Sequence, residues 1–332
     1  MELNVKGKLY CRRKMKNYRN ERNKHTMQHF TGFNAMFMEK IGFPEEARNC
    51  FNKVLKRLDD EKENGFLFDE IRHEYLYPTA SDLGKALDRL TALAEKMGMS
   101  EYTLHMVFLV SCGEVTLLRY RERGIDEAIF WDTMRDFRYK LMECWECKGV
   151  WGTFVAGWNS GFFELNRFAL GRFQFEKSEY NKKTVTLRGG YVLEKGARVI
   201  GFHIPSSGEP LTDEVRLASY KKAYEFYKDE FNGGPVVFEC GSWLLYKEHY
   251  NFLPKHLNIL RFMDDFEIIE SSDSDGFGDA WRVFGRYADE KPENLPTDTS
   301  LRRAFAERLK AGKPTGHGLG VIVFDGEKII NK

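Results

Sequence analysis

Two short apolar segments of the sequence end in side chains that can act as acids, bases or nucleophiles. Residues 197–204 are rich in β-branched and aromatic types and carry His203 near their end, and residues 236–240 end in Glu239 and Cys240. A histidine can act as a general base near neutral pH, and a cysteine beside a base can carry an acyl group. We therefore expect these side chains at the ends of two neighbouring strands, with His203 as the base available to Cys240.

Each candidate also has a purely structural interpretation. His203 can be a histidine bonded to a loop carbonyl, and Cys240 can be a buried, inert thiol. Glu176 lies on the polar face of the alternating segment 171–176, where it is either a catalytic carboxylate or one half of a surface ion pair. Because Glu239 and Cys240 are adjacent in a strand, they face opposite sides, and one of them is expected to face the opening between the strands.

The two apolar segments are joined by a loop and a helix. Pro205–Pro210 contains residues that end a strand, and Thr212 can cap the helix that follows. Strands joined in this way lie parallel through a right-handed crossover, and the loop then meets the helix N-terminus, where N–H groups can hold an anion. The candidate cofactor-binding residues of this region are Ile204, Ser206, Ser207, Gly208, Thr212 and Ser242.

The spacing of apolar residues in the sequence changes near Trp151. Before that point apolar residues recur at three- and four-residue steps, which predicts helices, whereas later segments alternate or are continuously apolar, which predicts strands. We predict an α+β protein with a basic tail at 1–25, an all-α domain at 26–165 and a mixed-sheet domain at 166–332. Two hairpins are expected, one pairing 191–194 with 198–203 and one pairing 266–270 with 281–284. Ser242 is expected to begin a helix that carries Tyr246 and Tyr250.

Composition limits the class of protein. The chain has 332 residues, 42% hydrophobic and 30% charged, with a net charge of +1, so it favours neither nucleic acid nor an anionic membrane. Residues 1–24 hold nine Lys or Arg against Glu2 and Glu21, a pattern of a solvated tail or of an arm for an acidic partner. Six cysteines without framework spacing indicate a cytoplasmic protein, and the single Cys144-x-x-Cys147 pair lacks the further ligands of a metal site.

The order meander, loop, helix, strand, Ser-capped helix and hairpin resembles the GNAT acyltransferase fold. More narrowly, it resembles bacterial acyltransferases in which a helical N-terminal domain precedes a GNAT-like C-terminal domain. The motifs that carry this resemblance are Leu170-Gly-Arg-Phe-Gln-Phe-Glu176, His203-Ile-Pro205, Gly208-Glu-Pro-Leu-Thr212, Cys240-Gly-Ser-Trp-Leu-Leu245, Leu253-Pro254, Asn258-Ile259 and Leu295-Pro-Thr-Asp-Thr-Ser-Leu301.

The resemblance implies direct transfer of an acyl group from acetyl-CoA or a longer acyl-CoA to a small-molecule or amine acceptor. It also implies that Tyr246 or Tyr250 protonates the leaving thiolate, although two tyrosines four residues apart are also ordinary packing. One departure concerns the phosphate loop, which has a single glycine, Gly208, and is followed by acidic residues that repel a pyrophosphate. A catalytically silent ligand-binding module and a scaffold or nucleic-acid partner acting through the tail therefore stay open as alternatives, as does the oligomeric state.

Overall fold

The computed structural model describes residues 31–77 and 82–332. The predicted basic tail and the first residues of the predicted helical domain lie outside this part of the chain. By their contacts the described residues fall into two compact units, one holding the chain up to Arg119 together with Val150–Ser160, and the other holding Tyr120–Gly149 with Gly161–Lys332. The predicted fold class, a helical N-terminal part followed by a mixed sheet, is confirmed.

The first unit is a bundle of helices arranged around α6. Its elements are α2 (Gly32–Lys40), α3 (Glu45–Asp60), α4 (Lys62–Leu76), α5 (Leu83–Lys96), α6 (Glu101–Ser111) and the 3-10 helix η1 (Ala156–Asn159). Every residue of α6 from Thr103 to Ser111 is buried, and α2, α3, α5 and η1 pack against it. A helix that is apolar on all sides is stable only when neighbours cover it completely, so α6 is the core of this unit. Helices α7 (Gly113–Glu122) and α10 (Ser160–Phe163) contain the unit boundaries.

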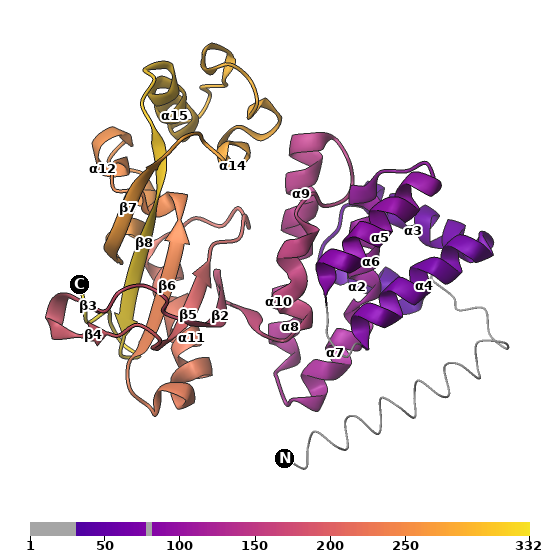
Figure 1. Cartoon of the computed structure of the whole chain (residues 1–332), viewed down its shortest axis with the longest axis horizontal. Helices are drawn as coiled ribbons and strands as arrows, with labels where there is room; N and C mark the ends of the chain where they lie inside the picture. The colour runs from indigo at the N-terminus through magenta and orange to yellow at the C-terminus, as the bar shows by residue number, and fades with distance from the viewer. Residues whose placement is uncertain (1–30, 78–81) are drawn as a thin grey trace. The chain divides into compact units, whose positions relative to one another are not determined.

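The second unit holds a six-stranded mixed sheet of order β1-β2-β5-β6-β8-β7 (Figure 1). These strands are β1 (Arg167–Leu170), β2 (Phe173–Glu179), β5 (Arg198–His203), β6 (Val236–Ser242), β8 (Thr315–Phe324) and β7 (Glu267–Ser274), with β3 (Val185–Thr186) and β4 (Val192–Leu193) as a separate pair. The helices are α8 (Glu127–Met134), α9 (Asp136–Lys148), α11 (Asp213–Tyr227), α12 (His249–Phe252), α13 (Asn258–Met263), α14 (Ala280–Phe284) and α15 (Ser300–Lys310). The 3-10 turns are η2 (Arg188–Gly190), η3 (Lys228–Phe231), η4 (Trp243–Leu245), η5 (Gly285–Tyr287) and η6 (Pro292–Asn294).

The predicted parallel pair is confirmed. β5 and β6 pair in parallel, with Ile200 opposite Phe238 and Gly201 opposite Glu239, and α11 connects them. Thr212 caps α11 as expected, because its Oγ1 accepts a hydrogen bond from the Val215 N–H. All other neighbours in this sheet pair antiparallel, so β5 and β6 form the only parallel contact among the strands that the structure describes.

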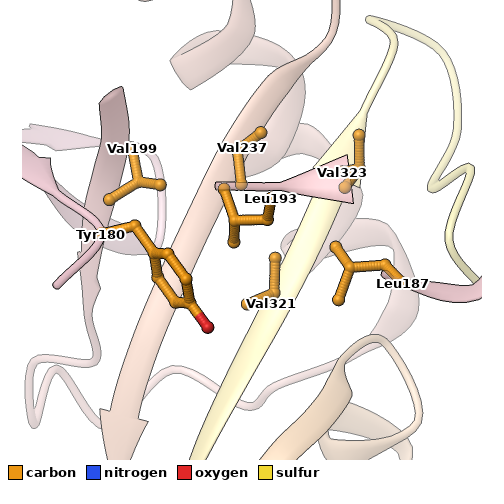
Figure 2. Packing of buried hydrophobic residues seen from close by; sticks show 7 residues of the cluster. All are labelled: Tyr180, Leu187, Leu193, Val199, Val237, Val321 and Val323. Carbon is orange, nitrogen blue, oxygen red and sulfur yellow. The ribbon is translucent and has the colours of Figure 1, made fainter. Parts of the chain in front are cut away.

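The two faces of the sheet are buried in different ways. One face carries aromatic rings, with Phe173, Phe202 and Tyr220 of α11 within 4.4–6.0 Å of one another between ring centroids. The other face carries valines of β5, β6 and β8, over which the β3–β4 arm lays Leu187 and Leu193 (Figure 2). Leu187 and Leu193 shield this end of the second face from water. Polar side chains occupy the remainder of that face.

Three predicted elements were wrong. The segment 281–284 is not the hairpin partner of β7, because it belongs to α14, and β7 pairs with β8 instead. The segment 198–203 does not pair with 191–194, because β5 pairs with β2 and β4 pairs with β3. Tyr246 and Tyr250 do not share a helix, since β6 runs on to Ser242, η4 follows it, and α12 begins only at His249.

Close backbone contact at Gly318 yields a stability prediction. A Cβ atom there would lie 2.0 Å from the Leu245 carbonyl oxygen, a distance that only a backbone shift can relieve. We expect Gly318→Ala to lower the free energy of unfolding by about 1–3 kcal/mol, the usual cost of overpacking, in urea denaturation. The control is Gly241→Ala, in the paired strand, where the nearest atom to the new Cβ is 3.9 Å away. Equal stability of the two variants would contradict the close packing of η4 on β8.

Candidate active site on the polar face of the sheet

The parallel strands β5 and β6 separate near their C-terminal ends. Their pairing ends at Gly201 and Glu239, yet β5 continues to His203 beside β2, and β6 continues to Ser242 beside β8. Within the described chain, the facing edges of the two strands beyond these residues therefore have no ladder between them. Backbone N–H and C=O groups at such an opening are available to an extended ligand.

Strand alternation decides which side chains meet on the face beside this opening. Glu176, Gly201 and Glu239 stand in one row across β2, β5 and β6, and His203 stands next to Gln174 in the adjacent row. Paired residues in a sheet project to the same face, so these polar side chains share one face. Cys240 is displaced by one residue from Glu239 and projects to the opposite, aromatic face.

A chain of three polar side chains crosses this face. Arg167 donates from Nε and Nη2 to Glu176 Oε2 at 2.8 and 2.7 Å, and Glu176 Oε1 lies 2.8 Å from His203 Nε2. Burial opposes the charge on Glu176, but the hydrogen bond with His203 and the Arg167 guanidinium outweigh it, so the pKa of the carboxyl is lowered. An ionised carboxylate only accepts hydrogen bonds, which assigns the proton of the neutral imidazole to Nε2 and the basic lone pair to Nδ1.

Gly201 makes room for the Glu176 side chain. A Cβ atom on Gly201 would lie 3.1 Å from Glu176 Cγ and 3.6 Å from Glu176 Oε1. The glycine therefore lets the carboxylate lie flat over β5 on its way to His203. The missing side chain also leaves the row between Glu176 and Glu239 without a barrier.

Glu239 has the opposite electrostatic environment. The side chain is half-buried, and burial together with the nearby Glu270 raises its pKa, while Lys182 acts in the other direction. Lys182 is itself engaged with Glu270 at 2.9 Å. Two carboxyl groups thus flank Gly201 on one face, one held in the charged form and one pushed toward the neutral form.

Two buried residues, Gln174 and Asp136, form a hydrogen-bonded pair next to His203. Gln174, which is 1% exposed, donates from Nε2 to Oδ1 of Asp136 at the start of α9 over 2.9 Å. Asp136 is equally buried, and desolvation raises its pKa against the opposing charge of Lys140. These contacts tie α9 to β2, and Thr133 ties α8 to β1 by accepting the Ala169 N–H at 2.9 Å.

The loop after β5 is fixed by a buried arginine. Arg172 donates to the carbonyl oxygens of Pro205 at 2.8 Å and Glu209 at 3.0 Å. Gly208 adopts a positive φ of 80°, which glycine allows without strain, and Ser207 Oγ accepts from the Glu209 N–H. The loop that was predicted to meet a phosphate is therefore shaped by side-chain clamps, with Ser206 exposed and Ile204 half-buried beside it.

The remaining candidates lie outside the His203 cluster. Cys240 is 1% exposed, and burial raises the pKa of its thiol, so the structure does not bring it beside His203 as an activated nucleophile. Ser242 Oγ accepts from the Leu244 N–H at 3.1 Å and caps η4. The Tyr246 hydroxyl donates to Asp273, the Tyr250 hydroxyl donates to Asp264 at 2.8 Å, and burial raises the pKa of both phenols.

Arg167 and Asp136 were not predicted from the sequence. Arg167 has a local signal, because a two-residue turn at Gly171-Arg172 places it opposite Glu176 in a hairpin. Asp136 has no comparable signal, since its contact with Gln174 joins residues 38 apart in the chain. Within the part of the chain that the structure describes, no group of three or more His, Cys, Asp or Glu residues is arranged to hold a metal, and no helix is long and apolar enough to cross a membrane.

This architecture is that of known acyltransferases. A solved acyltransferase in complex with decanoyl-CoA and teicoplanin has a TM-score of 0.58 at 20% identity, covering 88% of this chain and 99% of its own. An acyltransferase mutant in complex with octanoyl-CoA has a TM-score of 0.59 at 19% identity with the same coverage. A search among curated proteins finds no significant match.

Two family models match adjacent parts of the sequence. The model of the N-acyltransferase N-terminal domain matches residues 34–165, and the model of the GNAT-like C-terminal domain matches residues 167–322. The chain belongs to the GNAT-like acyltransferases and carries an N-acyltransferase N-terminal domain followed by a GNAT-like C-terminal domain.

The Arg167–Glu176 pair yields a pH prediction. Because the folded-state pKa of Glu176 is lowered, its contribution to stability is present above the unfolded-state pKa and is lost as the pH falls through the folded-state value. We expect Glu176→Gln to lower the free energy of unfolding by about 1–3 kcal/mol at pH 7. That loss should shrink as the pH falls below the ordinary glutamate pKa of about 4.3, because the unfolded-state carboxyl protonates there and the native carboxyl follows at a still lower pH.

The matched control is Glu179→Gln at the exposed end of the same strand, where the change should stay within about 0.5 kcal/mol. Urea denaturation of the three proteins between pH 3 and pH 7 measures the effect. A loss that is independent of pH would show that the charge of Glu176 does not contribute.

Proposed function

We propose that this protein transfers an acyl group directly from an acyl-CoA to a small-molecule acceptor, an amine in the first instance. The observation that carries the proposal is the separation of β5 from β6 next to the Arg167–Glu176–His203 chain. The opening presents backbone groups for an extended donor, and the Arg167–Glu176–His203 chain presents a base beside it. The solved acyltransferases of the same fold that hold decanoyl-CoA, octanoyl-CoA and CoA support a thioester donor.

Arg167, Glu176 and His203 each have a defined role in this mechanism. His203 takes the proton from the acceptor nucleophile, Glu176 fixes the imidazole and stabilises the imidazolium that forms, and Arg167 keeps Glu176 ionised. The nucleophile adds to the thioester carbonyl, whose oxygen is polarised by N–H groups of β5 beyond its last pairing with β6. The tetrahedral intermediate then expels the coenzyme A thiolate, which takes up a proton, and the imidazolium returns its proton to solvent.

Direct transfer is favoured over a covalent acyl-cysteine route. The Cys240 thiol lies on the aromatic face with its pKa raised, whereas His203 lies on the polar face. Proximity of donor and acceptor at one opening removes the need for an acyl-enzyme, because orienting two bound reactants already supplies a large part of the rate.

We expect His203→Ala to lower the transfer rate about 10²–10⁴-fold, the usual contribution of a general base, whereas Cys240→Ala retains most of the activity. Thiol release from decanoyl-CoA with a panel of amines and alcohols identifies a productive acceptor, and the variants are then compared on it. Circular dichroism confirms that both variants are folded. A dead Cys240→Ala variant, with an acylated thiol in the native protein by mass spectrometry, would replace direct transfer with the covalent route.

A silent ligand-binding module is the second candidate function, and a specific observation favours it. Glu209, Asp213 and Glu214 surround the start of α11, and all three are exposed, so they disfavour a pyrophosphate at that helix end. Arg216 offsets part of this charge by contacting Asp213 at 3.0 Å, but it also holds Asp265 at 2.6 Å. Coenzyme A affinity therefore discriminates the two functions.

We expect decanoyl-CoA, octanoyl-CoA or acetyl-CoA to raise the melting temperature with increasing concentration, because a ligand of the native state stabilises it. Glu209→Gln should tighten binding if the pyrophosphate lies at the start of α11, since one repulsive charge is removed. The control is Glu225→Gln on the exposed side of the same helix, which should leave the affinity unchanged. A melting temperature that stays unchanged at millimolar concentrations of all three thioesters would favour the silent module.

A further inference from the structure

A second histidine–carboxylate pair with an attached hydroxyl lies at the far end of the sheet. Ser274, the last residue of β7, has its Oγ 3.1 Å from Nδ1 of His317 on β8, and His317 Nε2 lies 3.2 Å from Asp279 Oδ2. These three side chains come from a strand end, the neighbouring strand and the N-cap of α14. They share no residue with the Arg167–Glu176–His203 chain.

The backbone around this cluster is fixed by further contacts. Thr315 Oγ1 donates to the Gly276 carbonyl at 3.1 Å, which holds the loop after Ser274 against the start of β8. Arg282 donates to Asp279 Oδ1 at 2.9 Å while its guanidinium lies 4.1 Å from the ring centroid of Trp281. One oxygen of Asp279 is therefore held by Arg282 and the other oxygen faces His317.

The hydrogen bonds assign the proton positions. An ionised Asp279 accepts from Nε2–H of His317, which leaves the Nδ1 lone pair to accept the Ser274 hydroxyl proton. A serine whose hydroxyl proton points to an imidazole that is in turn oriented by a carboxylate is an activated nucleophile. The ring nitrogens exchange roles relative to the arrangement of serine hydrolases, but both functional contacts, from serine to histidine and from histidine to carboxylate, are present.

We propose that Ser274, His317 and Asp279 form a hydrolytic triad that cleaves small acyl esters and thioesters with good leaving groups. Ser274 Oγ forms a bond with the acyl carbonyl carbon while its proton passes to His317 Nδ1. The bond from the carbonyl carbon to the leaving oxygen or sulfur then breaks, and the imidazolium gives the leaving group the proton. Water then bonds to the carbonyl carbon of the acyl-serine while one of its protons passes to His317 Nδ1. The bond from that carbon to Ser274 Oγ breaks, and the imidazolium returns the proton to Oγ, which releases the carboxylic acid and restores the serine hydroxyl.

Exposure of the cluster defines the substrate class. The His317 side chain is 50% exposed, so both an ester and the hydrolytic water reach the serine from solvent. Gly276 and Gly278 border the serine, and an added Cβ on either would meet no atom within 4 Å, which leaves open space above the loop. Because the serine is reached from solvent and activated esters carry good leaving groups, we expect small activated esters as substrates.

A fluorophosphonate probe and p-nitrophenyl butyrate test this inference on the full-length protein. The probe should label Ser274, as located by peptide mass spectrometry, and ester hydrolysis should fall on the order of 10²-fold or more in Ser274→Ala and His317→Gln. Asp279→Asn should also slow hydrolysis, because an amide fixes the wrong tautomer of His317. Ser274 and His317 are not buried, so these substitutions leave the fold intact.

Ser272→Ala, in the same strand and opposite His317 in the ladder, is the matched control and should hydrolyse the ester at the native rate. Absence of labelling at Ser274, or equal hydrolysis by the native protein and Ser274→Ala, would overturn the proposal whether or not acyl transfer is found.

Discussion

The ion pair between Arg167 and Glu176 is the interaction on which the site depends most. Arg167 is 8% exposed, and burying a guanidinium is costly unless a carboxylate meets it with good geometry. The pair joins the edge strand β1 to β2, and the second oxygen of Glu176 reaches over Gly201 to His203 on β5. One carboxylate therefore binds three strands together on the polar face and orients the imidazole as well. Loss of its charge would remove the carboxylate partner of a buried cation and the contact that orients the histidine.

The opposite face supplies the rigidity that such short contacts require. Phe173 and Phe175 of β2 pack on Phe202 of β5 with ring centroids 4.4 and 5.2 Å apart, and Tyr220 of α11 covers them. Close-packed rings restrict movement between neighbouring strands, because a shift of one strand would open voids against several rings at once. The polar chain on the other face thus rests on a platform whose geometry is set by apolar packing. Acid–base chemistry benefits from this arrangement, since a displacement of about 1 Å is enough to cost a large part of the rate.

Local signals in the sequence were sufficient to predict the parallel pair of β5 and β6. They were insufficient to predict the strands and side chains that contact this pair. The strand, loop, capped helix and strand around Thr212 predicted the parallel pair because each element has its own propensity and the crossover has one allowed hand. The segment 281–284 alternates like a strand, but it follows the N-cap Asp279 and ends at Gly285 with φ of 56°, so it forms a helical turn. The contact of Glu176 with His203 depends on the register between β2 and β5, which only the paired strands define. The sequence indicated that Glu239 and Cys240 face opposite sides, but it could not show that Cys240 is the one that faces the aromatic core.

The two carboxyl groups on either side of Gly201 divide acid and base character within one row of the sheet. Glu176 has its pKa lowered because His203 and Arg167 stabilise its charge, whereas burial and Glu270 raise the pKa of Glu239. Environments that move two pKa values in opposite directions are how one site holds an ionised and a neutral carboxyl together. A nucleophile bound over Gly201, as proposed above, would meet the Glu176–His203 pair on the β2 side and a more readily protonated carboxyl on the β6 side. Gly201 lies between the two carboxyl groups, and a Cβ atom there would press on the Glu176 side chain.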